Sequence, residues 1–278
     1  MKRIAVLAMA VLMIVCAIAP VSAATANGLF GDVPLYKGTI TVDGKLDEIY
    51  KQGLVIPTQV YNEQYKSEAT GTVYALHDGK NLYVAVAVNN VYPITEYNAK
   101  YDGTKSWSTT CVELYLDWTD KATDNKLGHK YYGRLDGKVV GASAVEGKEK
   151  EMGVTYGVVV DNAKNTYVAE FCVPMQNITT GANMGFNVCV NADANMGPAN
   201  NAKRTIAGIT PGIGAAIASW KSVTLSNKEA KLPEATTAAT TKAPTTKPVA
   251  PATFDAGIVL AVVAAAAGAG VVVSKKRH

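Results

Sequence analysis

The chain has 278 residues, 48% of them hydrophobic, and its 27 Lys and Arg against 23 Asp and Glu give a net charge of +4. That excess belongs to the two ends, because residues 24–232 carry 20 basic and 21 acidic side chains. A basic nucleic-acid-binding surface is therefore excluded. The nearly neutral middle is long enough for one domain with a substantial core.

Residues 1–23 have the layout of a secretory signal peptide. Lys2 and Arg3 precede an apolar run over residues 4–18, and small residues lead to a cleavage position after Ala23. The apolar run is too short for a good membrane span. We expect the signal to be removed and the mature chain to be exported.

The C-terminal segments predict a tether and an anchor. Residues 233–253 are rich in Pro and Thr and lack large apolar side chains, which predicts a disordered linker. Residues 256–273 are apolar and uncharged, as in a transmembrane helix, and the basic tail 274–278 is expected in the cytoplasm. The layout resembles the wall-sorting signals of Gram-positive surface proteins, without their Leu-Pro-x-Thr-Gly motif. The domain is thus expected on the extracellular face of the membrane, held by a single-pass anchor.

Residues 33–228 predict an all-β domain, an antiparallel β-sandwich. Alternating large apolar residues predict strands over residues 39–42, 71–77, 81–88, 111–118, 129–135, 138–145, 155–160, 166–173, 185–190 and 219–225. The dipeptides Asp78-Gly79 and Asp136-Gly137 predict the turns of two hairpins. The Gly-, Ala- and Asn-rich stretch 195–218 predicts a long loop.

Three cysteines remain after removal of the signal peptide. Cys111, Cys172 and Cys189 are an odd number without close spacing, and each falls in a predicted strand. This pattern favours small buried hydrophobic side chains over a disulfide framework or a zinc site.

Five sequence blocks occur in a recognisable order. They are residues 41–48 (TVDGKLDE), 73–86 (VYALHDGKNLYVAV), 111–117 (CVELYLD) with Trp107 before it, 167–174 (YVAEFCVP) and 184–193 (MGFNVCVNAD). The succession resembles the family 9 carbohydrate-binding modules and the wider DOMON-like group of sandwiches, over roughly residues 38–226. The resemblance implies binding of sugar chain ends between aromatic rings, calcium that supports the fold, and a common attachment to glycoside hydrolases.

The resemblance also suggests which side chains contact sugar. Trp107 lies in a polar loop and matches the aromatic platform before the Val-Glu strand, while a loop Trp that caps the sandwich edge is the alternative. Tyr101 would extend that platform, or it is an ordinary tyrosine at a strand edge. Trp220 is a second ring of the site or a core side chain. Glu113 and Asn191 are expected to accept hydroxyl protons from the sugar.

Calcium is expected as a structural cofactor on the same resemblance. Asp43 and Asp47 are candidate ligands near the start of the domain, and Asp193 is a third within an Asx-rich stretch. Carboxylate oxygens are the ligands that calcium prefers. Ordinary turns explain all three residues as well.

We therefore expect a non-catalytic cell-surface protein that binds a poly- or oligosaccharide, such as a plant cell-wall glycan. A structural or adhesive surface module without a sugar site is one alternative. Membership of a glycoside-hydrolysing system is the other, with Glu113, Asp117 and Glu170 as the available acids. The sequence contains no Gly-x-Ser-x-Gly, His-Glu-x-x-His or P-loop motif to support catalysis.

Overall fold

The computed structural model describes residues 29–59, 69–89, 109–193, 204–210 and 216–233. These residues form twelve strands and two short 3-10 helices, η1 (Glu48–Gln52) and η6 (Ile217–Ser219). The strands are β1 (Leu29–Leu35), β2 (Leu54–Pro57), β3 (Thr70–His77), β4 (Asn81–Asn89), β5 (Cys111–Asp117), β6 (His129–Arg134), β7 (Val139–Ser143), β8 (Thr155–Asp161), β9 (Thr166–Pro174), β10 (Asn183–Asp193), β11 (Arg204–Gly208) and β12 (Lys221–Glu229).

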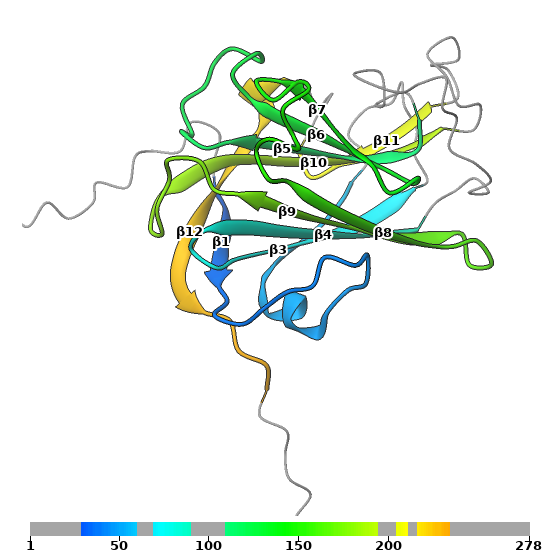
Figure 1. The fold of residues 1–278 in the computed structure, drawn as a ribbon, viewed down its shortest axis with the longest axis horizontal. Helices are drawn as coiled ribbons and strands as arrows, with labels where there is room; N and C mark the ends of the chain where they lie inside the picture. The colour runs from blue at the N-terminus through cyan, green and yellow to red at the C-terminus, as the bar shows by residue number, and fades with distance from the viewer. Residues whose placement is uncertain (1–28, 60–68, 90–108, 194–203, 211–215, 234–278) are drawn as a thin grey trace, which may run out of the picture. The chain divides into compact units, whose positions relative to one another are not determined.

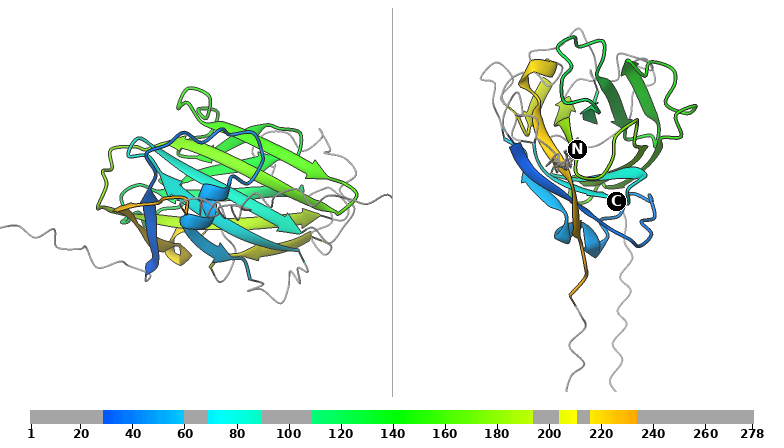
Figure 2. Two further views of the ribbon diagram at one scale, coloured as in Figure 1. Left: turned by 90° about the horizontal axis from the view of Figure 1, so that it is seen from below. Right: turned by 90° about the vertical axis from the view of Figure 1, so that its left-hand side faces the viewer.

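The strands build two layers that join along one side. Hydrogen bonding runs in the order β7-β6-β5-β10-β12-β1-β3-β4-β9-β8, with β11 paired to β10 and β2 paired to β3. One layer contains β5, β6, β7 and β10, and the other contains β3, β4, β8 and β9 (Figures 1 and 2). The parallel pair β1–β12 connects the layers. This arrangement confirms the predicted all-β class.

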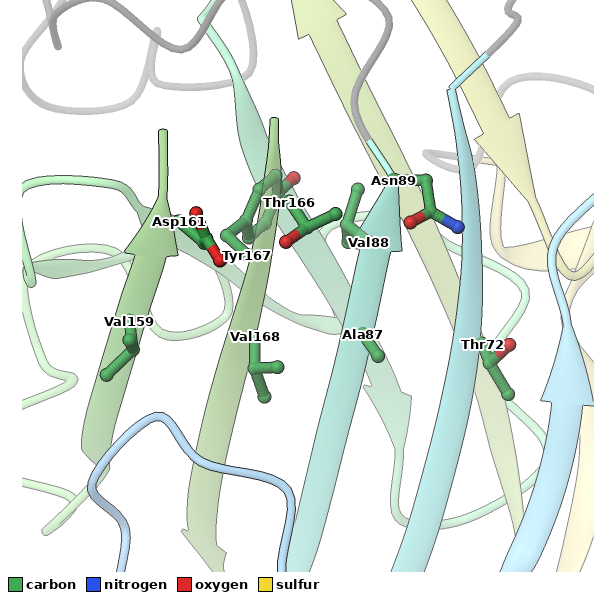
Figure 3. A pocket seen from close by; sticks show the side chains of 9 residues that line it. All are labelled: Thr72, Ala87, Val88, Asn89, Val159, Asp161, Thr166, Tyr167 and Val168. Atoms are coloured by element: carbon green, nitrogen blue, oxygen red, sulfur yellow. The ribbon is translucent and has the colours of Figure 1, made fainter. Parts of the chain in front are cut away.

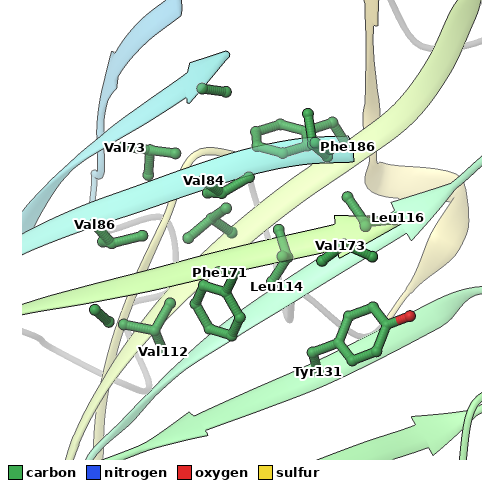
Figure 4. Close-up of a cluster of buried hydrophobic side chains, with 14 of the residues drawn as sticks. Val73, Val84, Val86, Val112, Leu114, Leu116, Tyr131, Phe171, Val173 and Phe186 are labelled. Carbon is green, nitrogen blue, oxygen red and sulfur yellow. The ribbon is translucent and has the colours of Figure 1, made fainter. Parts of the chain in front are cut away.

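The core lies between the two layers and follows from alternation along the strands. On β4, Leu82, Val84 and Val86 point inward and are fully buried. Figure 4 shows Val84 and Val86 opposite β5 and β10, whose inward side chains include Leu114 and Phe186. Successive side chains of a strand point to opposite faces, so each of these strands also presents an outer face.

Both predicted hairpins are present. β3 pairs antiparallel with β4, and β6 with β7. Gly79 and Gly137 have φ of +87° and +83°, a conformation that glycine adopts without steric cost. Asp78 Oδ1 accepts hydrogen bonds from the backbone N–H groups of Lys80 and Asn81, at 2.7 and 2.6 Å. Local turn chemistry therefore determined these two elements.

Two predictions about secondary structure were wrong. Residues 39–42 form no strand, since the backbone that follows them bonds to a side chain, Glu170, instead of a neighbouring strand. The predicted loop 195–218 contains β11 and η6, because β11 pairs antiparallel with the end of β10. The strands β1 and β2 were not predicted at all.

The three cysteines occupy strands and are free thiols, as predicted. Cys111 and Cys189 are buried and Cys172 is half-buried. No helix among the described residues is long and apolar enough to cross a membrane. Residues 1–23, 233–253 and 256–278 were predicted to be signal, linker and anchor, and all but Pro233 lie outside the described residues.

A second cluster of apolar side chains covers the outer face of the β3-β4-β9-β8 layer. Ile49 and Tyr50 of η1 pack on Leu76 and Ala85 of that layer.

His77, the last residue of β3, is fully buried. Its Nε2–H donates to the backbone oxygen of Ser226 at 3.0 Å, and its Nδ1 accepts from the Gly79 N–H at 3.1 Å. The folded protein therefore holds this imidazole in its neutral form.

We expect His77 to make the protein less stable in acid. Burial lowers the pKa of His77, so below about pH 6.5 the unfolded chain takes up a proton that the folded chain resists. The free energy of unfolding, measured in urea at pH 7.5, 6 and 5, should fall more steeply for the wild type than for His77→Gln, whose amide does not titrate and can still donate to the Ser226 oxygen. The raised pKa of Glu170 acts in the opposite direction but is common to both proteins. Parallel curves would contradict the prediction.

Candidate functional site

The outer face of β5, β6 and β10 carries an unusual set of polar side chains. Cross-strand pairing places nine residues of these strands in three adjacent rows. We call this set the polar face: Arg134, Cys111 and Asn191; Tyr132, Glu113 and Cys189; Lys130, Tyr115 and Asn187. The intervening residues, such as Leu114 and Val188, point into the core. The polar face therefore lies on the exterior side of this layer.

The charged and amide groups of the polar face are almost completely buried. Glu113, Lys130 and Arg134 expose 5%, 6% and 2% of their surfaces, and Asn187 and Asn191 expose none. Every residue of β5 is buried, which shows that this strand is covered on both sides. Burying charged and amide groups costs free energy unless each one has polar partners. Buried charged and amide side chains on the outer face of a sheet are therefore more typical of a functional site than of a hydrophobic core.

Hydrogen bonds orient several of these groups. Asn191 Nδ2 donates to Glu113 Oε1 and lies 3.4 Å from Cys111 Sγ. Arg134 Nη2 donates to Asp136 Oδ2 in a partly buried ion pair. These contacts hold a carboxylate, an amide and a guanidinium on neighbouring strands in fixed positions.

Lys130 adds an ammonium group to the same face. Its Nζ lies 5.9 Å from the centre of the Tyr115 ring. Burial lowers the pKa of Lys130, and the nearby Glu113 carboxylate opposes that shift. The polar face thus combines hydrogen-bond acceptors with strong donors, which suits a neutral ligand rich in hydroxyl groups.

Trp220 packs beside the polar face. Its ring centre lies 5.3 Å from that of Tyr115, and it forms an apolar cluster with Cys189, Ile206 and Ile217. Only 2% of Trp220 is exposed. Of its two possible roles, sugar contact or core packing, the structure therefore favours packing. In this position Trp220 supports the Tyr115 side of the polar face.

The other predicted sugar contacts divide into two groups. Glu113 and Asn191 are brought together, as their hydrogen bond shows. Trp107 and Tyr101 lie outside the described residues. Their contribution to the site stays a prediction.

Of the predicted calcium ligands, the structure describes the side chains of Asp43 and Asp47. The two carboxylate oxygens of Asp43 accept hydrogen bonds from the backbone and side chain of Lys45, and these bonds lower the pKa of Asp43. Asp47 precedes η1 without a side-chain capping bond, and Asp193 ends β10 with its side chain outside the description. Among the described residues, no three His, Cys, Asp or Glu side chains group into a metal site. Calcium binding stays a prediction.

Of the nine residues of the polar face, sequence reasoning assigned Glu113 and Asn191 to the site and missed the other seven. Lys130, Tyr132 and Arg134 alternate along β6 and so share one side, which is a signal that the sequence contains. Asn187 occupies the corresponding side of β10. Their proximity to Glu113 depends on strand register, which the sequence does not specify.

The acids do not form the pair that glycoside hydrolysis needs. Glu113 and Asp117 are four residues apart on one strand, so their Cα atoms are roughly 13 Å apart, a backbone spacing wider than the about 5–10 Å between the carboxylates of a catalytic pair. Asp117 accepts bonds from Thr119 and from the Ala122 N–H in the turn after β5. Glu170 lies on the outer face of the other layer, on the far side of the core from Glu113.

Two solved structures share the fold. Both are family 9 carbohydrate-binding modules from Caldicellulosiruptor kristjanssonii, one in complex with cellotriose and one with glucose. Each is 16% identical to this chain, and the TM-scores are 0.56 and 0.53. The alignments cover 74% and 73% of this chain and 98% of each module.

The family assignment rests on a sequence model. No curated protein matches the chain. The model described as "Carbohydrate family 9 binding domain-like" matches residues 42–228, more than half of the chain and nearly the whole sandwich. The chain therefore belongs to the family 9 carbohydrate-binding domain-like proteins.

Proposed function

We propose that the chain is a non-catalytic carbohydrate-binding protein whose ligand contacts the polar face. The observation that carries the proposal is the set of buried charged and amide side chains on the exterior side of β5, β6 and β10. Sugar hydroxyls donate and accept hydrogen bonds, so they need both kinds of partner. Glu113 would accept hydroxyl protons, while Lys130, Arg134 and Asn191 would donate to hydroxyl and ring oxygens.

The proposed ligand is a β-glucan or a related plant cell-wall glycan. Family membership supports this class, and two modules of the same fold are complexes with cellotriose and glucose. Sugars also present apolar C–H faces, which aromatic rings contact well. Trp107 is the proposed stacking platform, and Tyr101 is proposed to extend it.

The proposed setting is the outside of a Gram-positive-type cell. The signal-peptide-like pattern of residues 1–23, the Pro- and Thr-rich stretch 233–253 and the apolar segment 256–273 support it. A domain held there would keep a polysaccharide at the cell, alongside secreted glycoside hydrolases. Structural calcium, with Asp43, Asp47 and Asp193 as candidate ligands, is part of the same proposal.

Calorimetric titration of the chain with cellotriose, xylotriose and glucose, with and without calcium, tests the proposal. We expect saturable binding of at least one sugar and no release of shorter products on prolonged incubation. Because the chain includes the apolar segment 256–273, the titration uses a detergent, and its headgroup must not be a sugar that would compete with the added glycan. Failure to bind any glycan would favour the structural or adhesive alternative, and product formation without added enzyme would contradict the non-catalytic assignment.

A further inference from the structure

A hollow lies on the outer face of the other layer of the sandwich, over β3, β4, β9 and β8. It has a volume of about 370 Å³, within the usual range of ligand sites. Figure 3 shows this hollow running across the strands. The polar face belongs to the other layer, so the two surfaces are separated by the whole hydrophobic core.

Small side chains form the floor of the hollow. Thr72, Ala87, Val168 and Val159 are consecutive cross-strand partners on β3, β4, β9 and β8. Four strands at the usual spacing give a row roughly 14 Å long, enough for a short oligosaccharide. All four present methyl groups, and 45% of Val159 is exposed. The floor is therefore flat, apolar and accessible.

A row of polar side chains forms one wall. Asn89, Thr166 and Asp161 are cross-strand partners on β4, β9 and β8, each two positions from the floor residue of its strand. They supply an amide, a hydroxyl and a carboxylate along the length of the floor. The Asp161 carboxylate is paired with Lys164 Nζ at 2.9 Å, so the wall carries little net charge. A neutral ligand suits it better than an anion or a cation.

The N-terminal loop bounds the other side. Asp43 and Gly44 donate backbone hydrogen bonds to Glu170 Oε2, at 2.9 Å each. A Cβ atom on Gly157 of β8 would lie 2.8 Å from the Gly44 nitrogen, which shows how closely this loop covers the sheet beside the floor. The hollow, which we call the groove, thus has an apolar floor and one polar wall, and the N-terminal loop covers the sheet beside it.

The geometry points to this groove as a second, independent carbohydrate subsite, one that holds a neutral oligosaccharide across the four strands. The inference rests on the proposed function for its ligand class. Methyl groups contact the C–H faces of the sugar, and Asn89, Thr166 and Asp161 bond its hydroxyls. With no aromatic side chain in either row, binding should be weaker than at the polar face. Two sites on opposite faces would let one domain hold two glycan chains.

Nuclear magnetic resonance of the ¹⁵N-labelled full-length chain, titrated with millimolar cellohexaose, tests this subsite. We expect amide shifts at Ala87 and Thr166 that persist in the double variant Glu113→Gln/Asn191→Ala. Ala87→Lys, which fills the floor, should reduce those shifts at least fivefold. Val55→Lys, an exposed strand position outside the groove, should leave them unchanged. Thr166→Val serves as a second groove variant with an almost unchanged side-chain volume.

The outcomes separate the two proposals. Shifts confined to the polar face would overturn the second subsite and leave the proposed function standing. Groove shifts that disappear in the Glu113→Gln/Asn191→Ala variant would also overturn it, because the two sites would then not be independent. Absence of shifts anywhere in the wild type would count against both proposals.

Discussion

Glu113→Gln is expected to weaken cellotriose binding by roughly 10- to 100-fold. Hydrogen bonds to a charged group contribute about 1.5–3 kcal/mol each, and an amide supplies only one acceptor oxygen where the carboxylate supplies two. The substitution also removes the Glu113 charge, which favours the protonated form of Lys130. Binding constants from calorimetry at constant pH measure the effect.

Asp117→Asn is the matched control for Glu113→Gln. Asp117 lies on the same side of the same strand, but its oxygens are used by the turn that follows β5. Its substitution should change affinity by less than about twofold. Thermal unfolding must show that Glu113→Gln still folds, which we expect because a glutamine oxygen can accept the hydrogen bond from Asn191. Unchanged affinity in a folded Glu113→Gln protein would remove the polar face as the sugar site.

Alternation made the central strands of the fold predictable. β4 and β9 show a regular two-residue period, and Gly79 marks a hairpin turn. The strand β1 contains Gly31 and Pro34 and pairs in parallel with β12, nearly two hundred residues away. Such a strand is stabilised by a distant partner and not by its own composition, so local patterns did not reveal it.

The candidate site was predictable in type but not in extent. Glu113 and Asn191 were identified by their positions within recognisable blocks of sequence. Lys130 and Arg134 become their neighbours only through the antiparallel register of β5 and β6. A shift of that register by one residue would turn both basic side chains to the other face of the layer. The residues that complete the site therefore depend on pairing between strands.

Glu170 shows how a sequence motif can suggest the wrong role. As an acid in a strand it was a candidate partner for Glu113 in catalysis. In the structure it is fully buried on the other layer, and its Oε1 accepts a hydrogen bond from the Tyr50 hydroxyl at 3.0 Å. Its Oε2 accepts the backbone N–H groups of Asp43 and Gly44. The carboxylate thus attaches the N-terminal loop and η1 to the outer face of the sheet.

Glu170→Ala is accordingly expected to lower the free energy of unfolding by about 3–5 kcal/mol. Removing the carboxylate leaves two backbone N–H groups and one hydroxyl without their acceptor, and each unsatisfied buried group costs about 1–3 kcal/mol. Urea unfolding at pH 7 measures the loss. Because Glu170 lies across the core from the polar face, cellotriose affinity at that face should stay within about twofold of the wild type in any variant that remains folded.

Glu170→Gln distinguishes the contribution of the three hydrogen bonds of Glu170 from that of its side-chain volume. The glutamine oxygen can accept the Asp43 and Gly44 N–H groups, while its amide donates to the Tyr50 oxygen. Burial raises the pKa of Glu170, so the neutral amide also avoids the desolvation of a charge. We expect a loss of about 1 kcal/mol or less, well below that of Glu170→Ala. Equal losses in the two variants would show that side-chain volume, not the three hydrogen bonds, explains why a carboxylate is buried here.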